Sequence, residues 1–152
     1  MRRILQLAGV GVLLLAAPQA FAMTEAECNA AWTKADTNND GTLTEAEADA
    51  GRYFAAHRVA NKPLVDGKLT KAAFLENCKA NMYMATKMEE GAPLAGANSF
   101  TEAQAQDRII AAGFSKVSAL KKDDKGIWRG TASDATKTTD VAVDFKGNVV
   151  AK

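Results

Sequence analysis

The sequence of 152 residues contains one histidine, His57, and its 19 Lys and Arg residues nearly balance 18 Asp and Glu residues. No long run of basic residues occurs, so the chain lacks the positively charged surface expected of a nucleic-acid-binding protein. The single histidine has no evident Ser or Cys partner in the sequence, so no nucleophile is paired with a base for catalysis. These absences predict a chain that binds no nucleic acid and is not an enzyme.

The apolar run near the start of the chain carries no charge and extends from Ile4 to Ala17. It is shorter than the roughly 20 residues that a membrane-spanning helix needs. Arg2 and Arg3 precede the run, and residues 20–22 (Ala-Phe-Ala) follow it as a small-x-small cleavage site. This order is typical of a secretory signal peptide. We therefore predict that residues 1–22 are removed and that a periplasmic or secreted chain without a membrane span begins at Met23.

Two cysteines, Cys28 and Cys78, follow the predicted signal peptide. Disulfides persist in the oxidising compartments that exported proteins enter, whereas cytosolic thiols stay reduced. The alternative is a pair of buried free thiols. The export signal favours a disulfide between the two residues.

A run of oxygen-bearing side chains fills residues 36–47, which read DTNNDGTLTEAE. Ca²⁺ is a hard cation that takes about six to eight oxygen ligands, and a calcium-binding loop supplies them at defined positions around a sharply turning glycine. Gly41 stands at that turning position. The predicted ligands are side-chain oxygens and one backbone carbonyl: Asp36, Asn38, Asp40, the carbonyl of Thr42, and Glu47.

Helices are expected on both sides of this loop. Thr24 and Glu27 have capping-box spacing, which predicts a helix from there to about Ala35. A second helix is expected from Glu45 to about Val59, in an Ala- and Glu-rich stretch. Thr70 is expected to cap a third helix that continues to about residue 90, with Phe74, Cys78 and Met82 on its buried face.

A shortened repeat of the loop follows at residues 66–70, which read DGKLT and match DGTLT at residues 40–44. In this register Lys62, Leu64 and Ala73 occupy ligand positions, and none of these side chains can coordinate Ca²⁺. We predict a half-site without an ion, in which Leu69 pairs with Leu43 in a short two-stranded bridge.

The pattern changes after residues 91–99, a stretch rich in glycine and small residues that is predicted to be a linker. Thr101 and Gln104 form a second capping box, and the helix that they open is expected to stop at Gly113. Strands are predicted over residues 116–121, 127–132 and 141–145, with residues 149–150 extending the pairing. One helix packed on a three- or four-stranded antiparallel sheet is expected here.

Residues 36–47 resemble the EF-hand calcium-binding family, and residues 24–90 as a whole resemble an EF-hand pair whose second loop departs from the pattern. Residues 100–152 are similar to PepSY modules of exported bacterial proteins. That likeness is carried by Phe100-Thr101, Ala112-Gly113-Phe114, Val117, Leu120, Gly126-Ile127-Trp128, Val141-Ala142-Val143-Asp144 and Gly147. The second resemblance implies a helix on a small antiparallel sheet and a binding or inhibitory role that often concerns peptidases.

The sequence as a whole predicts an α+β protein with a signal peptide (1–22), a helical EF-hand-like domain (23–90), a linker (91–99) and a PepSY-like domain (100–152). The expected function is that of an exported, non-enzymatic protein with one Ca²⁺ site. The alternative is a protein that binds a peptide or inhibits a peptidase, in which calcium only stabilises the fold.

Overall fold

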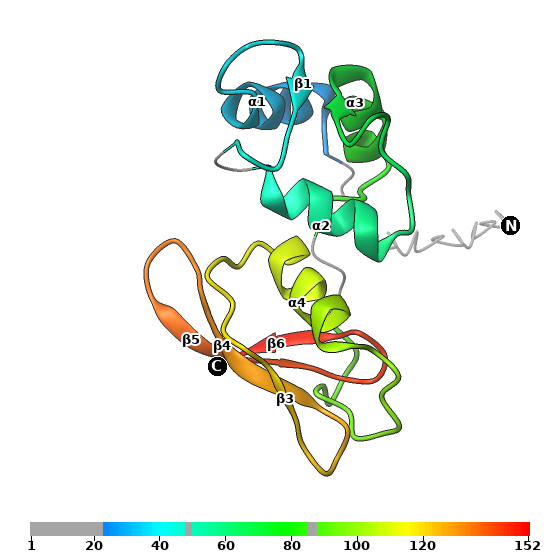
Figure 1. Ribbon diagram of the computed structural model, residues 1–152, viewed down its shortest axis with the longest axis vertical. Helices are drawn as coiled ribbons and strands as arrows, with labels where there is room; N and C mark the ends of the chain where they lie inside the picture. The colour runs from blue at the N-terminus through cyan, green and yellow to red at the C-terminus, as the bar shows by residue number, and fades with distance from the viewer. Residues whose placement is uncertain (1–22, 48–49, 85–87) are drawn as a thin grey trace, which may run out of the picture.

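The computed structural model describes residues 23–47, 50–84 and 88–152, so the predicted signal peptide lies outside the described residues. Within them the chain is α+β, as predicted. The helices are α1 (Glu25–Ala35), α2 (Gly51–Val59), α3 (Lys71–Lys79) and α4 (Glu102–Ala111). The strands are β1 (Thr42–Leu43), β2 (Leu69–Thr70), β3 (Lys121–Lys122), β4 (Trp128–Ser133), β5 (Thr138–Val143) and β6 (Val149–Ala151). Helices α1 to α3 form one half of the molecule, and α4 with the larger sheet forms the other (Figure 1).

Helices α1 and α4 begin where the capping boxes predict. The Thr24 hydroxyl accepts from the Glu27 amide at 3.3 Å, and the Glu27 carboxylate accepts from the Thr24 amide at 2.8 Å. Thr101 and Gln104 make the same reciprocal pair at the start of α4, at 3.2 and 3.0 Å. These bonds satisfy amides that have no partner within the helix.

Helix α3 ends at Lys79, and the prediction that it continues to about residue 90 was wrong. Asn81 has φ +60°, and the Asn81 and Met82 amides donate to the carbonyls of Cys78 and Asn77, each at 2.9 Å. This is a Schellman motif, in which a left-handed residue closes the helix. Asparagine tolerates that conformation better than most residues, so it can replace the expected glycine.

Helix α2 also differs from the expectation, because it begins at Gly51 and Glu45 lies in a turn. The Glu47 amide donates to the Thr44 carbonyl at 3.2 Å, and the Ala50 amide donates to the Glu47 carbonyl at 3.0 Å. The described residues just before α2, 45–47 and 50, therefore form turns and not a helix. The sequence predicts a helix in this stretch because Ala and Glu are both strong helix formers.

The helical half has an aromatic core centred on Phe74, which is fully buried. Its ring centroid lies 5.3 Å from that of Trp32, 4.8 Å from that of Tyr53 and 5.0 Å from that of Tyr83. Strands β1 and β2 pair antiparallel beside this core, with Leu43 opposite the buried Leu69. The predicted bridge between the two leucines is thus confirmed.

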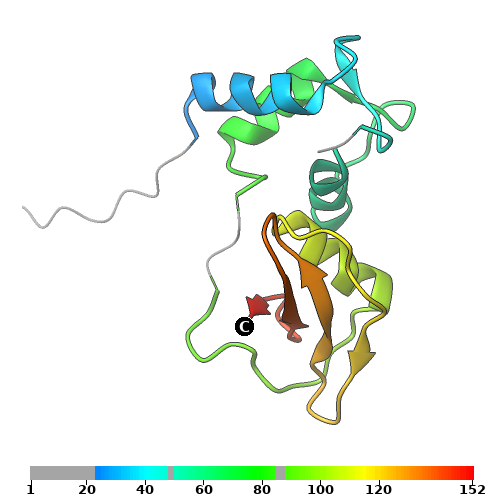
Figure 2. The ribbon, with the colours of Figure 1, turned by 90° about the vertical axis from the view of Figure 1, so that its left-hand side faces the viewer.

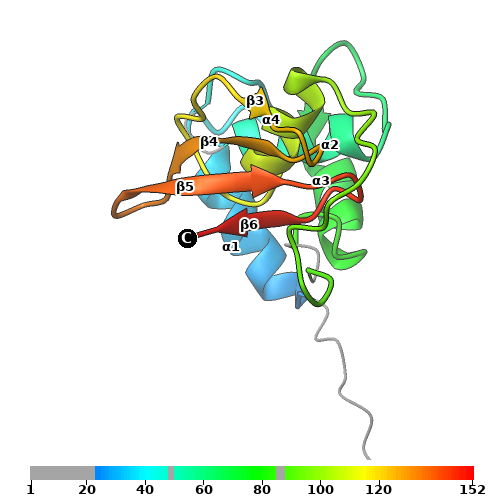
Figure 3. The ribbon, with the colours of Figure 1, turned by 90° about the horizontal axis from the view of Figure 1, so that it is seen from below.

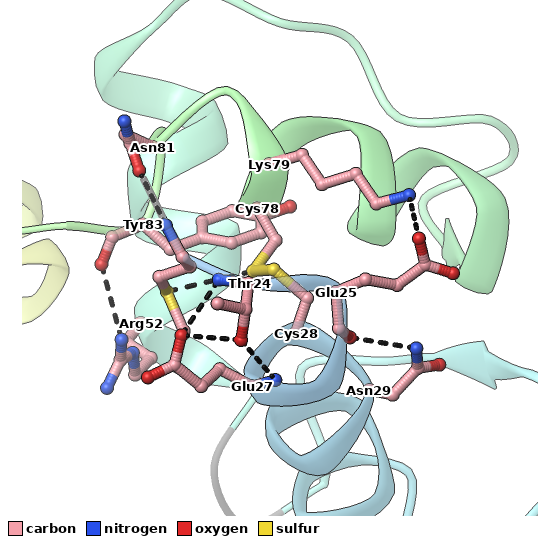
Figure 4. The surroundings of a disulfide bond; sticks show 11 residues. Thr24, Glu25, Glu27, Cys28, Asn29, Arg52, Cys78, Lys79, Asn81 and Tyr83 are labelled. Atoms are coloured by element: carbon pink, nitrogen blue, oxygen red, sulfur yellow. Dashed lines mark hydrogen bonds and ion pairs between the residues drawn. A yellow bond between two sulfur atoms is a disulfide. The ribbon is translucent and has the colours of Figure 1, made fainter. Parts of the chain in front are cut away.

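A disulfide joins Cys28 of α1 to Cys78 of α3, as predicted, and both residues are buried (Figure 4). The two helices also share an exposed ion pair between Lys79 and Glu25 at 2.9 Å. The disulfide therefore fixes the helix that leads into the candidate calcium loop against the helix that follows the second loop.

The larger sheet is antiparallel with the strand order β3-β4-β5-β6. Helix α4 covers one face, where Ile109 packs with Leu120, Val141 and Val143. The opposite face has no helix over it in the described residues (Figure 3). The first predicted strand was too long, since only Lys121 of that range lies in β3.

The segment predicted as a linker, 91–99, runs along the sheet half of the molecule (Figure 2). The Leu94 amide donates to the carboxylate of the fully buried Asp144 at 2.9 Å, and the Gly96 amide donates to the Lys125 carbonyl at 3.0 Å. A Cβ on Gly96 would lie 2.6 Å from the Phe145 ring, so a larger residue here would have to displace that ring. The segment is therefore packed against the sheet half.

Helices α2 and α4 pack against each other and join the two halves (Figure 1). Arg58 of α2 donates from Nε to both carboxylate oxygens of Asp107 in α4, at 2.9 and 3.0 Å. The same guanidinium bonds to Glu45, which lies in the turn after the candidate calcium loop. None of the helices in the described parts of the chain is long and apolar enough to cross a membrane.

Replacing Cys28 and Cys78 together by serine should lower the free energy of unfolding by about 4 kcal/mol in the chain-entropy description. The reason is that the bond closes a loop with a sequence separation of 50 residues. Urea unfolding of the oxidised and variant proteins measures the difference.

The matched control is Glu25→Gln, which removes the exposed ion pair between the same two helices. Its effect should stay under about 1 kcal/mol. Equal stability of the wild type and the double serine variant would contradict a constraining role for the disulfide.

Candidate metal centre

The end of α1 places the first predicted ligand. Asp36 directly follows the helix, and its amide donates to the Trp32 carbonyl at 2.8 Å. The residue is 4% exposed. Glu47, the last predicted ligand, is 9% exposed and precedes α2. Two carboxylates are thus buried at the two ends of the loop, although carboxylates are seldom buried without a partner.

The loop turns at Gly41, which has φ +82° in the left-handed region that glycine adopts readily. The Gly41 amide donates to Asp36 Oδ2 at 3.2 Å. This hydrogen bond closes the loop and orients the Asp36 carboxylate, so the turning glycine and the first ligand support each other.

Among the residues that the structure describes, one oxygen of each buried carboxylate has no hydrogen-bond partner. Asp36 Oδ1 and Glu47 Oε1 are both inaccessible to solvent and unbonded. The other oxygens are occupied: Asp36 Oδ2 by the Gly41 amide and Glu47 Oε2 by the Thr44 amide at 2.8 Å. A buried carboxylate oxygen without a donor is costly, and a bound cation removes that cost.

The remaining side-chain ligands lie on the exposed rim of the loop. Asp40 Oδ1 accepts from the Thr42 amide and hydroxyl, each at 2.8 Å, and Oδ2 accepts from the Asn38 amide group at 3.2 Å. The bonds from Thr42 hold the pKa of the Asp40 carboxyl below its usual value. Asp40 is therefore ionised at neutral pH and available to a cation.

The structure does not gather all the predicted ligands into one cluster. Within the described ranges, no group of three or more His, Cys, Asp or Glu side chains is arranged to hold a metal ion. The Asp40 carboxylate is turned to Thr42 and Asn38, while Asp36 and Glu47 keep open oxygens on the buried side. Coordination by Asp40 would exchange hydrogen bonds within the loop for contacts to the ion.

The second loop closes without ligands. Asp66 and Gly67 have φ +50° and +69° and form a tight turn between Val65 and Lys68, which are bridged antiparallel. Lys62, at the first ligand position, donates from Nζ to the Asn77 side-chain oxygen at 2.6 Å. The Lys62 ammonium group is thus hydrogen-bonded to α3.

His57, the other group weighed as functional in the sequence, is 3% exposed and lies in the core of the helical half. Burial lowers its pKa, so the ring is neutral at pH 7. Nε2 lies 3.2 Å from the Tyr83 hydroxyl, and Nδ1 lies 3.4 Å from the Lys62 carbonyl. Both ring nitrogens thus have polar neighbours in the core, as expected of a histidine with a structural role.

Sequence reasoning missed the bridge from the loop exit to the sheet half. Arg58 contacts Glu45 on one side and Asp107 on the other, and these two bonds raise the Arg58 pKa above its ordinary value. Separations of 13 and 49 residues leave no periodic signal for such contacts.

The chain was compared with models of protein families, with curated proteins and with solved structures, and no match was found.

Gly41→Ala should lower the free energy of unfolding by about 1–2 kcal/mol, because a side chain disfavours the left-handed conformation. A Cβ at Gly41 would meet no atom within 4 Å, so the loss would come from the backbone and not from a clash. Thermal or urea unfolding measures it.

Gly51→Ala is the matched control, because a Cβ there also meets nothing within 4 Å but the residue lies in α2. It should raise stability by up to about 0.5 kcal/mol, because Gly51 is the first residue of the helix and not an interior one. Equal effects of the two substitutions would show that the loop does not need the left-handed turn.

Proposed function

We propose that the chain is an exported, non-enzymatic protein that binds one Ca²⁺ in the loop of residues 36–47. The ligands are Asp36, Asn38, Asp40, the Thr42 carbonyl and Glu47. The two unbonded, buried oxygens of Asp36 and Glu47 carry this proposal. Residues 24–90 then act as an EF-hand pair whose second loop holds no ion.

Calcium suits this donor set better than other biological metals. All the proposed donors are oxygens, and no His or Cys lies within residues 36–47. Transition metals favour imidazole and thiolate ligands, whereas Mg²⁺ demands a small, regular octahedral site. A loop with an exposed rim tolerates the larger and less regular coordination shell of Ca²⁺.

The ion's role in this proposal is structural. Asp36 lies at the end of α1 and Glu47 lies before α2, so a shared cation ties the two helices together. Without it, the loop carboxylates repel one another, and two of them are partly removed from water. Extracellular calcium modules bind with Kd values of about 10⁻⁴ to 10⁻³ M, which suits a constant external supply of the ion.

Export supports the same proposal. The order of charged, apolar and small residues over residues 1–22 is that of a signal peptide. The Cys28–Cys78 disulfide is consistent with an oxidising compartment. We therefore propose that the protein resides in the periplasm or the extracellular space.

Titration calorimetry of the chain from Met23 onward should detect one Ca²⁺ per molecule. Glu47→Gln should weaken binding at least about tenfold, since it removes a charged ligand. The glutamine retains an oxygen that can accept from the Thr44 amide, so the turn before α2 is preserved.

Asp124→Asn is the matched control, because it makes the same change of charge at an exposed position in the other half. It should leave calcium binding unchanged. Absence of calcium binding in the wild type, or an equal loss in both variants, would refute the assignment of the site.

The second candidate function is binding of an extended peptide by the sheet half, as the resemblance to PepSY modules suggests. The observation that favours it is a cavity of about 530 Å³ on the sheet face opposite α4, with Lys121, Arg129 and Lys152 around an apolar floor. In that case partner binding would persist in Glu47→Gln, and calcium would serve stability alone.

A further inference from the structure

A groove of about 750 Å³ lies between the two halves of the molecule. Its walls are mostly apolar and come from α2, from α4, from β6 and from residues 81, 82, 84 and 88 after α3. They include Ala56, Val59, Met82, Phe114 and Val149. We call this the interhelical groove. Its volume is in the range of small-molecule sites, which are lined mainly by apolar groups with a few polar ones.

One cation, Arg108 of α4, lines the interhelical groove. Its guanidinium carbon lies 4.1 Å from the centroid of the Phe100 ring. On Gly147, a Cβ would approach Arg108 Nε to 3.0 Å, so glycine leaves the space that the guanidinium occupies. The planar group is thus held between a ring and a glycine, and its orientation is fixed.

The Arg108 guanidinium has no acceptor among the described residues. Its Nε atom is buried and unbonded. By contrast, Arg52 donates to the Tyr83 carbonyl, Arg58 pairs with Asp107, and Arg129 pairs with Asp123 at 2.7 Å. Burial lowers the pKa of Arg108, which is the mark of a charge that is not compensated.

We propose that the interhelical groove binds a small amphiphilic carboxylate, with the carboxylate on Arg108 and the alkyl chain along the apolar walls. A partly buried guanidinium without a counter-ion is unfavourable, and a carboxylate matches its planar edge with paired hydrogen bonds. The apolar walls gain free energy when an alkyl chain displaces water from them.

The charges in the groove favour a monoanion. Arg108 is the one charged side chain among the described residues that line it. A single guanidinium balances one carboxylate, whereas a dianionic phosphate would bring a second charge into a mainly apolar site. The bound molecule would contact both α2 and α4, and it would therefore hold the two halves of the protein together.

Decanoate and decyltrimethylammonium test this proposal, because they share an alkyl chain and carry opposite charges. In calcium-free buffer, titration calorimetry of the chain from Met23 onward should show one decanoate bound and weaker binding of the cation. Amide NMR shifts on decanoate addition should cluster at Val59, Ala111 and Val149.

Arg108→Gln should reduce decanoate affinity at least about tenfold and remove the preference over decyltrimethylammonium. Arg108→Lys keeps the charge but loses the planar guanidinium, so its decanoate affinity should lie between those of the wild type and Arg108→Gln. Arg129→Gln, on the opposite face of the sheet, is the matched control and should bind decanoate as the wild type does.

Circular dichroism shows whether Arg108→Gln is folded. If the variant is unfolded, binding of decanoate and decyltrimethylammonium to the wild type tests the proposal by itself. Equal binding of both amphiphiles, shifts outside the groove, or no decanoate binding would overturn the proposal. So would sedimentation that shows a dimer dissociated by Arg108→Gln, since a second copy would then occupy the groove.

Discussion

Two buried carboxylate oxygens set the central constraint on this molecule. They are Asp36 Oδ1 and Glu47 Oε1, and neither has a donor among the described residues. The structure fixes the loop at Asp36 and at Leu43. Helix α1 ends directly before Asp36 and is bonded through Cys28 to α3, while Leu43 within the loop pairs with Leu69. Because these contacts hold the loop in place, the two oxygens cannot be exposed to water without a cost in free energy. The proposed Ca²⁺ would balance both oxygens at once and join α1 to α2.

The consequences of the loop extend to the other half of the chain. Helix α2, which follows the loop, packs on α4, and Arg58 connects Glu45 with Asp107. The pair is partly exposed, so its direct contribution to stability is small, about 1 kcal/mol or less. The position of Arg58 is more important than its energy, because its guanidinium links the turn after the loop, α2 and α4. The proposed ligands of the two halves would therefore both act on the helix pair α2 and α4, beside the interhelical groove.

The sequence predicts the local features of this fold well, because short-range chemistry decides them. Thr24 and Thr101 start helices through bonds to residues three positions on, and the repeated DGxLT pattern leads to the Leu43–Leu69 pair. The disulfide follows from the compartment that the signal pattern implies. The α+β class follows from the change of periodicity along the chain.

What the sequence does not reveal depends on contacts between distant residues. Asn81 ends α3 through its left-handed backbone, and no glycine or proline nearby in the sequence indicates that the helix stops there. Leu94 and Asp144, separated by 50 residues, fix the segment that reads as a linker. The open oxygens of the loop and the unpaired Arg108 likewise appear only when neighbours are known, because whether a polar group is satisfied is a property of its surroundings.

Calorimetric melting of the chain from Met23 onward, in chelator, in Mg²⁺ and in Ca²⁺, tests the central claim most directly. At a hundredfold excess of Ca²⁺ over its Kd, the folded state should gain about 2.7 kcal/mol, and the melting temperature should rise by several degrees. Mg²⁺ should do much less. An identical melting temperature in chelator and in calcium would contradict the account, because the buried oxygens of Asp36 and Glu47 would then need no ion.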